Sequence, residues 1–330
     1  MPFRWRMVSG LLASALLVVF TATATAWASV KPAQKASKVT NINIGYVPYA
    51  NDSSLFLGMK KGFFRQRGLN VTVTPQATPL AVISSMESGQ EQFGFVTSVI
   101  LVNAVVQGTS IKCVANVDGN QTPNPKQDGT VLVSAPHSGI TSVKQLAGKT
   151  VGIVQLHSLN SLSIDLLAKK AGINPTSVKQ LQIPFPQMPE ALTTGKIDAA
   201  IIVSPFLQSA LSNGAHAITH PEVDLFPGAS TVCFAATSGY LKSHSGVAKS
   251  FAAAMAKSIT YSKTHQREAA ATLPQYHLAT SVENALSEKL GTDWSPAINL
   301  SSIAYQEKVM KDYGVINTIP PVRQLVWTPK

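Results

Sequence analysis

Short apolar runs alternate with helical patterns over the first hundred or so residues that follow the N-terminal segment. Residues 41–46, 71–73 and 93–96 have the apolar or alternating pattern of strands, whereas Leu55, Phe56, Met59 and Phe63 recur at helical spacing. The pattern predicts helices over residues 51–67, 80–88 and 98–107. Strands that alternate with helices in this way favour a mainly parallel α/β sheet.

The same alternation returns farther along the chain. Strands are expected at 150–154, 178–183 and 197–203, and helices at 160–171 and 188–194. Extended segments at 130–134 and 231–236 bracket this second unit, and helical patterns follow from Ser245. Because some 300 residues exceed what one small core needs, we predict two lobes. The first combines residues 41–132 with 233–330, and the second spans 133–232.

A faint repeat relates the two units. Gly89 ends one predicted helix and is followed nine residues later by Ser98, and Gly195 precedes Ser204 by the same interval. Each unit therefore places a small hydroxyl residue where a strand gives way to the next helix. This match supports two related lobes.

The N-terminal residues have the pattern of a secretory signal. Arg4 and Arg6 precede an apolar run at 11–20, and Ala26-Trp27-Ala28 offers the small residues that signal peptidase requires. The run is too short for a membrane-spanning helix. We therefore expect a signal peptide over residues 1–28, cleaved near Ala28, a disordered lead-in over 29–40, and export to the periplasm.

The charge and the cysteine content bear on two further questions, a nucleic-acid partner and a disulfide-stabilised fold. The net charge of +11 comes from lysines that are mostly scattered singly, without a basic run interleaved with aromatic residues. We therefore expect no nucleic-acid partner. Two cysteines, Cys113 and Cys233, are too few for a disulfide scaffold, and the sequence leaves open whether they pair.

The candidate binding residues follow the predicted strands, because ligands of open parallel sheets bind beyond the carboxyl ends of the strands. The loops concerned contain hydroxyl, amide, imidazole and aromatic side chains but no Asp, Glu, Lys or Arg. Such a set suits a neutral heterocycle or a small monoanion, held by hydrogen bonds, helix N-termini and stacked rings. The predicted ligand-binding residues are Tyr46, Tyr49, Asn51, Gln76, Ala77, Thr97, Ser98, His157, Ser158, Asn160, Phe185 and Ser204.

Structural roles for some of these residues stay open. Phe185 could equally belong to the core, and Ser98 and Ser204 could be helix N-caps. Motifs for nucleophilic, phosphate-binding or zinc-dependent catalysis do not occur. His216 and His220 have metal-like spacing but lie in a strand-like segment, and His157 has no evident partner acid. We therefore predict no enzyme activity, no metal and no cofactor.

Three sequence blocks resemble the periplasmic binding proteins for sulfonates, taurine, nitrate and thiamine precursors. The similarity spans about residues 41–320, and its motifs are specific only in combination. They are Ile44-Gly45-Tyr46 with Gly62-Phe63-Phe64 and Gly68-Leu69-Asn70-Val71, then residues 143–152, and then Gly195-Lys196-Ile197-Asp198-Ala199 with Ser204-Pro205-Phe206.

The resemblance implies a type II periplasmic-binding fold with two α/β lobes, a two-strand hinge and a small-molecule ligand held by cleft closure. It also implies a monomer that delivers its ligand to an ABC-transporter permease with its ATPase. Two departures weaken the transfer of any particular ligand: Ser204 replaces an acidic residue, and Gln92 replaces an expected Asp. The cysteine-rich motif of a cytosolic pyrimidine-forming relative does not occur. A sensory protein, or an exported enzyme acting on a heterocycle, remains an alternative.

Overall fold

The computed structural model describes residues 39–117, 124–125, 128–226, 229, 231–287, 290 and 294–329. These residues belong to one compact unit that spans Lys38–Lys330. The predicted signal peptide and nearly all of the lead-in lie outside the described residues. Along the described part of the chain, no helix combines the length and apolar character that crossing a bilayer requires.

The first sheet has five strands in the order β2-β1-β3-β10-β4. Strand β1 pairs in parallel with β2 and β3, whereas β10 runs antiparallel to β3 and β4. The strands are β1 (Thr40–Tyr46), β2 (Leu69–Pro75), β3 (Phe93–Thr97), β4 (Ile111–Asn116) and β10 (Val232–Thr237). We call this sheet with its helices the first lobe.

The second sheet repeats the arrangement, in the order β7-β6-β8-β5-β9. Strand β6 pairs in parallel with β7 and β8, and β5 runs antiparallel to β8 and β9. The strands are β5 (Thr130–Ser134), β6 (Thr150–Ile153), β7 (Lys179–Gln182), β8 (Ala199–Val203) and β9 (His216–Thr219). This sheet with its helices is the second lobe. The predicted two-lobed α/β fold is confirmed, and both sheets are mixed because β10 and β5 run against their neighbours.

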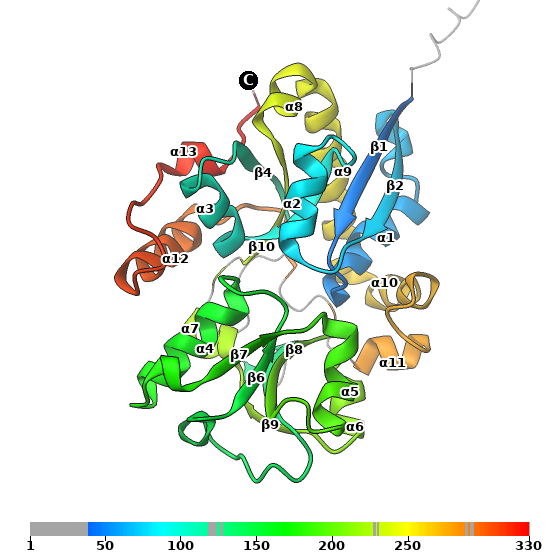
Figure 1. The fold of residues 1–330 in the computed structure, drawn as a ribbon. Helices are drawn as coiled ribbons and strands as arrows, with labels where there is room; N and C mark the ends of the chain where they lie inside the picture. Colours follow the sequence, from blue (N-terminus) through cyan, green and yellow to red (C-terminus); the bar gives the residue numbers. More distant parts are fainter. Residues whose placement is uncertain are drawn as a thin grey trace, which may run out of the picture. The chain divides into compact units, whose positions relative to one another are not determined.

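Helices cover both sheets (Figure 1). In the second lobe α4 and α7 lie on one side of the sheet, and α5 and α6 on the other. In the first lobe α1 packs on α9, and the C-terminal helices α12 and α13 pack on α3. The helices are α1 (Ser53–Lys60), α2 (Pro79–Glu87), α3 (Ser98–Val106), α4 (Leu159–Lys170), α5 (Met188–Thr193), α6 (Leu207–Ser212), α7 (Pro221–Leu225), α8 (Ser238–Ser243), α9 (Ser245–Thr264), α10 (Gln266–Ala270), α11 (Val282–Ser287), α12 (Leu300–Asp312) and α13 (Val322–Leu325).

The first helix is shorter than the pattern predicts. It ends at Lys60, and Gly62 takes a left-handed conformation with a φ of 72°. A short 3-10 turn, Arg65–Arg67, then leads into β2. Glycine is the residue that most readily adopts this φ, so it ends the helix one to two turns early.

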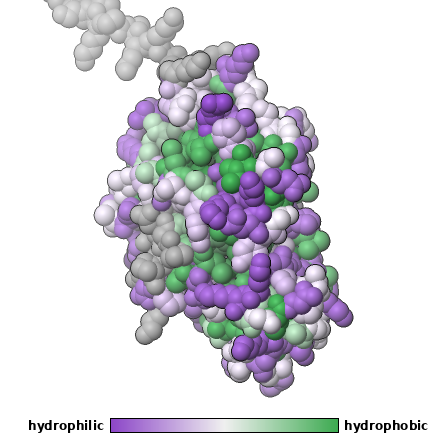
Figure 2. All heavy atoms as spheres, turned by 90° about the vertical axis from the view of Figure 1, so that its left-hand side faces the viewer, coloured by the Kyte–Doolittle hydropathy of each residue, from purple (hydrophilic) through white to green (hydrophobic). Residues whose placement is uncertain are grey.

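Apolar side chains from distant parts of the chain form the core of the first lobe. Phe93 of β3 stacks on Phe251 of α9 with ring centroids 4.0 Å apart, and both are fully buried. Cys113 and Cys233 lie on the neighbouring strands β4 and β10, and both are buried. Figure 2 shows hydrophobic residues interspersed with hydrophilic ones on the face that carries α12 and α13.

Candidate functional site

A small cavity lies where residues of both lobes meet, with about 40 Å³ open to the centres of water molecules. The first lobe contributes residues of β3, the residues after β1, the start of α2 and the start of β10. The second lobe contributes the start of α4 and one residue from each of four other positions. The lining residues are Val47, Tyr49, Pro79, Phe95, Thr97, Val154, Ser158, Leu159, Asn160, Phe185, Val203, Glu222, Thr231 and Val232.

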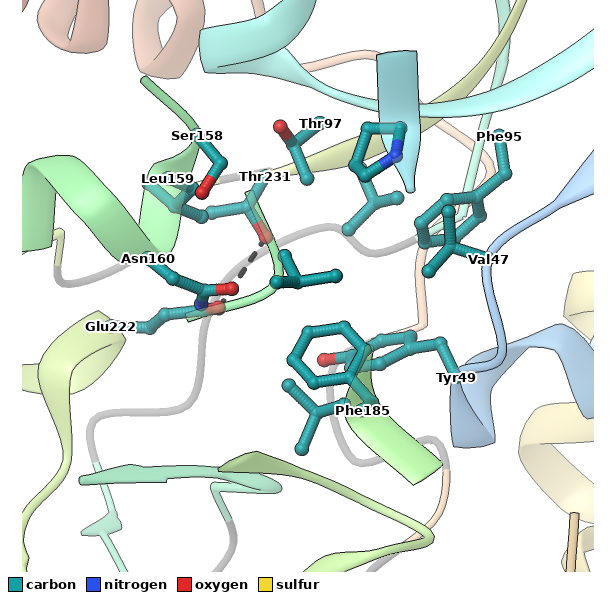
Figure 3. Close-up of a pocket in the computed structure, with 14 residues that line it drawn as sticks. Val47, Tyr49, Phe95, Thr97, Ser158, Leu159, Asn160, Phe185, Glu222 and Thr231 are labelled. Carbon is teal, nitrogen blue, oxygen red and sulfur yellow. Dashed lines mark hydrogen bonds between the residues drawn. The ribbon is translucent and has the colours of Figure 1, made fainter. Parts of the chain in front are cut away.

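The surface that lines the cavity is mainly apolar, and its few polar groups lie on one side, the polar wall, opposite the aromatic wall (Figure 3). Polar side chains gather on one side, namely those of Thr97, Ser158, Asn160, Glu222 and Thr231. The aromatic rings of Tyr49, Phe95 and Phe185 lie on the other side together with Val47. Such an arrangement suits a small molecule with one apolar face and one edge that forms hydrogen bonds.

Two of the hydroxyl groups on the polar wall also cap helices. Thr97 Oγ1 accepts a hydrogen bond from the Ile100 N–H at 3.4 Å at the start of α3. Ser158 Oγ accepts from the Ser161 N–H at 3.3 Å at the start of α4, and donates to the Gln155 carbonyl at 2.6 Å. The helices therefore place these hydroxyls at the cavity. The expected N-cap role falls on Thr97 rather than on Ser98.

Tyr49, on the aromatic wall, is held by a buried carboxyl. Its N–H donates to Asp52 Oδ2 at 3.0 Å, and the Asp52 side chain is almost completely buried. Burial raises the pKa of Asp52 well above its usual value. Tyr49 also approaches Phe95, with ring centroids 6.0 Å apart.

Glu222 is the one ionisable group of the polar wall, and the sequence analysis missed it. It lies in the first turn of α7, is 5% exposed, and accepts a hydrogen bond from Thr231 Oγ1 at 3.4 Å. The strand-end rule pointed to loops after parallel strands, whereas Glu222 follows the antiparallel edge strand β9. The expectation of a site without carboxylates therefore does not describe this cavity.

The structure brings five of the twelve predicted site residues together around the cavity. They are Tyr49, Thr97, Ser158, Asn160 and Phe185. Tyr46 instead packs edge-on against Phe56, with centroids 5.4 Å apart, and burial raises its pKa. Gln76 Nε2 donates to Glu91 Oε1 at 2.7 Å and to Ser85 Oγ at 3.2 Å, within the first lobe.

The other five predicted residues lie outside the cavity lining. Ser98 Oγ donates to Gln306 and to the Thr231 carbonyl, and Ala77 is exposed. Asn51 is buried, and Ser204 accepts the Ala50 N–H through its carbonyl at 2.8 Å, across the two lobes. His157 is exposed, with a φ of 59°.

Within the described residues, no three His, Cys, Asp or Glu side chains gather in a way that could hold a metal ion. His216 lies in β9, as the strand-like pattern predicted, and His220 Nδ1 lies 3.8 Å from Asp128 Oδ2.

The fold is that of solved binding proteins of transport systems. The alkanesulfonate-binding protein SsuA from Xanthomonas axonopodis pv. citri, solved with MOPS bound, superposes with a TM-score of 0.70 at 18% identity. The match covers 88% of this chain and 99% of that protein. The ligand-binding component of an ABC-type import system from Staphylococcus aureus gives 0.73 at 18% identity, covering 87% and 96%. The chain thus has the periplasmic-binding-protein fold.

The sequence also identifies the family. Residues 50–269 match the family described as NMT1/THI5 like, which is two thirds of the chain. The chain belongs to this family. The matched segment contains most of the cavity lining, from Pro79 to Val232.

A curated relative in Legionella pneumophila is named 4-amino-5-hydroxymethyl-2-methylpyrimidine phosphate synthase. It is 26% identical over 199 residues, which cover 60% of this chain and 59% of that protein. The chain thus spans less than two thirds of this relative's length. A Schizosaccharomyces pombe relative of the same name is 21% identical over 52% of this chain and 46% of its own length. The prediction of no enzyme activity is contradicted by these relatives, since both are named as synthases.

Proposed function

We propose that this chain binds a small, flat, largely neutral heterocycle in the cavity between its lobes and serves as the substrate-binding component of an importer. The observation that carries the proposal is the mainly apolar lining of the cavity, with aromatic rings on one side and a few polar side chains on the other. Tyr49 and Phe185 offer faces against which a ring can stack, and Asn160 and Glu222 offer hydrogen-bonding groups at its edge.

Both lobes contribute to each wall. Tyr49 and Phe95 come from the first lobe and Phe185 from the second, and Thr97 faces the same cavity as Ser158 and Asn160. A ligand that contacts all of them is bound fully only when the lobes are together. Because the ligand binds the closed arrangement more tightly than the open one, its binding shifts the equilibrium towards the closed arrangement.

The buried carboxyl of Glu222 narrows the ligand chemistry. An anionic sulfonate or nitrate would lie against a group that is itself anionic when ionised, which disfavours binding unless that group is protonated. A heterocycle that carries N–H groups can instead donate to Glu222, and the Asn160 amide can donate or accept. Among the ligands expected from the sequence, the proposed function favours the heterocycle over the anions.

Export and delivery follow from the same proposal. The signal-like N-terminal sequence, with its cleavage site near Ala28, supports a location in the periplasm. The solved proteins that share the fold include a component of an ABC-type import system. We therefore infer that a permease with its ATPase receives the ligand, and that the chain works as a monomer.

Synthesis of a pyrimidine is the second candidate function, and the names of the curated relatives favour it. The two candidates share a site but differ in what happens to the bound molecule. A binding component returns its ligand unchanged, whereas a synthase changes it.

Native mass spectrometry of gently purified mature protein tests the proposal. The released molecule is identified, returned to the apo protein and followed by calorimetry, together with 4-amino-5-hydroxymethyl-2-methylpyrimidine, MOPS and nitrate as probes. One unchanged heterocycle that binds at one per chain supports the importer component. Conversion of the bound molecule during incubation supports the synthase. Binding of MOPS or nitrate alone contradicts the proposed ligand class.

A further inference from the structure

The first turn of helix α2 is completed by a residue of the other lobe. Pro79 at its first position has no N–H, and the Ala81 N–H donates to Thr78 Oγ1 at 3.2 Å. The Leu80 N–H between them donates to Gln155 Oε1 of the second lobe at 2.8 Å. The free donors at a helix start need acceptors. Here one acceptor is present only when the two lobes meet.

A second hydrogen bond joins helix α3 to the loop that contains Gln155. Asn103 of α3 donates through Nδ2 to the His157 carbonyl at 2.9 Å. His157 adopts a left-handed conformation with a φ of 59°. The loop of residues 154–158, which joins β6 to α4, is therefore bonded to α2 through Gln155 and to α3 through His157.

Neither Gln155 nor Asn103 lines the cavity, yet both bonds end beside residues that do. Pro79 precedes Leu80, and Ser158 follows His157 and donates to the Gln155 carbonyl at 2.6 Å. The two inter-lobe bonds thus hold the start of α4, with Ser158 and Asn160, against the first lobe.

We propose that Gln155 and Asn103 form an inter-lobe latch that sets ligand affinity without touching the ligand. In this arrangement they are positioning residues. The inference rests on the proposed function for its effect on affinity, but the latch itself can be measured without any ligand. Opening the lobes exchanges both bonds for bonds to water, so each contributes only its net strength.

The magnitude follows from that net strength. Removing one such bond shifts the balance between latched and unlatched forms by about fivefold. A molecule that binds only the latched form then loses the same factor in apparent affinity when that form is a minor one. Contacts within the cavity are unchanged, so the loss is equal for every ligand that requires closure.

Cross-linking measures the latch in the absence of ligand. Leu80 and Leu156 are 56% and 45% exposed, and they flank the Leu80–Gln155 bond from opposite lobes. In the mature L80C/L156C protein, freed of bound molecules by partial unfolding and dialysis, the rate of intramolecular cross-linking by a short bismaleimide reports the latched population. The main-chain N–H of residue 80 is retained, and the native cysteines are buried.

The expected result is a lower rate with Gln155→Ala or Asn103→Ala, by about fivefold when the latched form is the minor one, and an unchanged melting temperature. Gln155→Glu keeps an acceptor for the Leu80 N–H at a helix start, and should restore the rate at pH 8. Gln187→Ala, an exposed glutamine of the second lobe, is the matched control and should leave the rate unchanged.

Equal cross-linking rates in all variants would overturn the latch. Lower rates together with lower melting temperatures in both alanine variants would also overturn it, because the residues would then support the fold rather than closure. Reduced rates in a protein that binds no heterocycle would leave the latch standing and remove the proposed ligand. The two proposals therefore fail separately.

Discussion

Gln92 Oε1 accepts the Asn43 N–H at 2.7 Å, as Asp198 Oδ2 accepts the Thr150 N–H at 2.8 Å in the other lobe. The main chains are also bonded alike, from the Gln92 N–H to the Asn43 carbonyl and from the Asp198 N–H to the Thr150 carbonyl. An amide in one lobe thus performs the role of a carboxylate in the other. Gln92, which stands where an Asp was expected, therefore has a structural role at strand β1 and gives no information about the ligand.

Replacing Gln92 should consequently affect stability alone. Gln92→Ala leaves the Asn43 N–H without its acceptor and should lower the free energy of unfolding by about 1 kcal/mol. Gln92→Asp should retain much of that stability, since Asp198 performs the role in the second lobe. Urea unfolding measures the first quantity and calorimetry the ligand affinity, which should not change. An affinity loss in Gln92→Ala at intact stability would place the residue in the ligand site.

The Asp52 carboxyl should be needed as an acceptor rather than as a charge. Asp52→Ala removes the acceptor of the Tyr49 N–H from a buried position and should cost about 2 kcal/mol of stability and weaken ligand binding. Asp52→Asn keeps an acceptor, and because burial already raises the pKa of Asp52, loss of the charge should cost little. Thermal unfolding and calorimetry of the two variants compare them. Equal damage from both would show that the negative charge matters.

Substitution of Glu222 should discriminate between ligand classes. Glu222→Gln replaces a carboxyl by an amide of the same shape and should weaken binding of an N–H-bearing heterocycle by about tenfold. The same change should strengthen binding of an anion such as MOPS. Calorimetry with both molecules measures the two affinities, and Glu190→Gln, an exposed glutamate of the second lobe, is the control. Unchanged affinities in Glu222→Gln would show that the Glu222 carboxyl does not contact the ligand.

Glu307 of α12 should make stability depend on pH. It is 1% exposed, its carboxyl oxygens have no hydrogen-bond partner in the described part of the chain, and burial raises its pKa to about 7. The folded state holds a proton that the unfolded state loses near pH 4.5, so stability falls as pH rises from about 4.5 to about 7.

Glu307→Gln removes this titration. The variant should be more stable than the parent at pH 8 by about 3 kcal/mol, and its advantage should shrink towards pH 5. Urea unfolding at both pH values measures the difference. An advantage that is the same at pH 5 and pH 8 would assign the change to packing rather than to the proton.

The fold was largely predictable because the apolar and polar residues of each lobe follow the spacing of strands and helices. Strands such as β3 and β8 are short apolar runs, and α2, α3 and α4 begin at Thr or Ser caps within a residue or two of the expected starts. The end of α1 was misjudged because the apolar pattern continues past Lys60 through Phe63, while the left-handed Gly62 ends the helix.

The site was less predictable because it depends on contacts between distant segments. Tyr49, Thr97, Ser158, Asn160 and Phe185 follow or end strands, and a rule about strand ends could find them. Glu222 joins them only because α7 packs near β5 and α4, and no local pattern records that packing. Gln76 matched the rule equally well, but Glu91 and Ser85 bind its side chain.

The strand order of the two sheets has a consequence for how the protein is made. All five strands of the second sheet lie between residues 130 and 219, whereas β4 joins the first sheet only through β10, which begins at Val232. During synthesis, which starts at the N-terminus, the chain can complete the second sheet while the first sheet still lacks β10. The lobe that is begun first is therefore finished last, and a nascent chain that ends before Thr231 lacks part of the polar wall of the cavity.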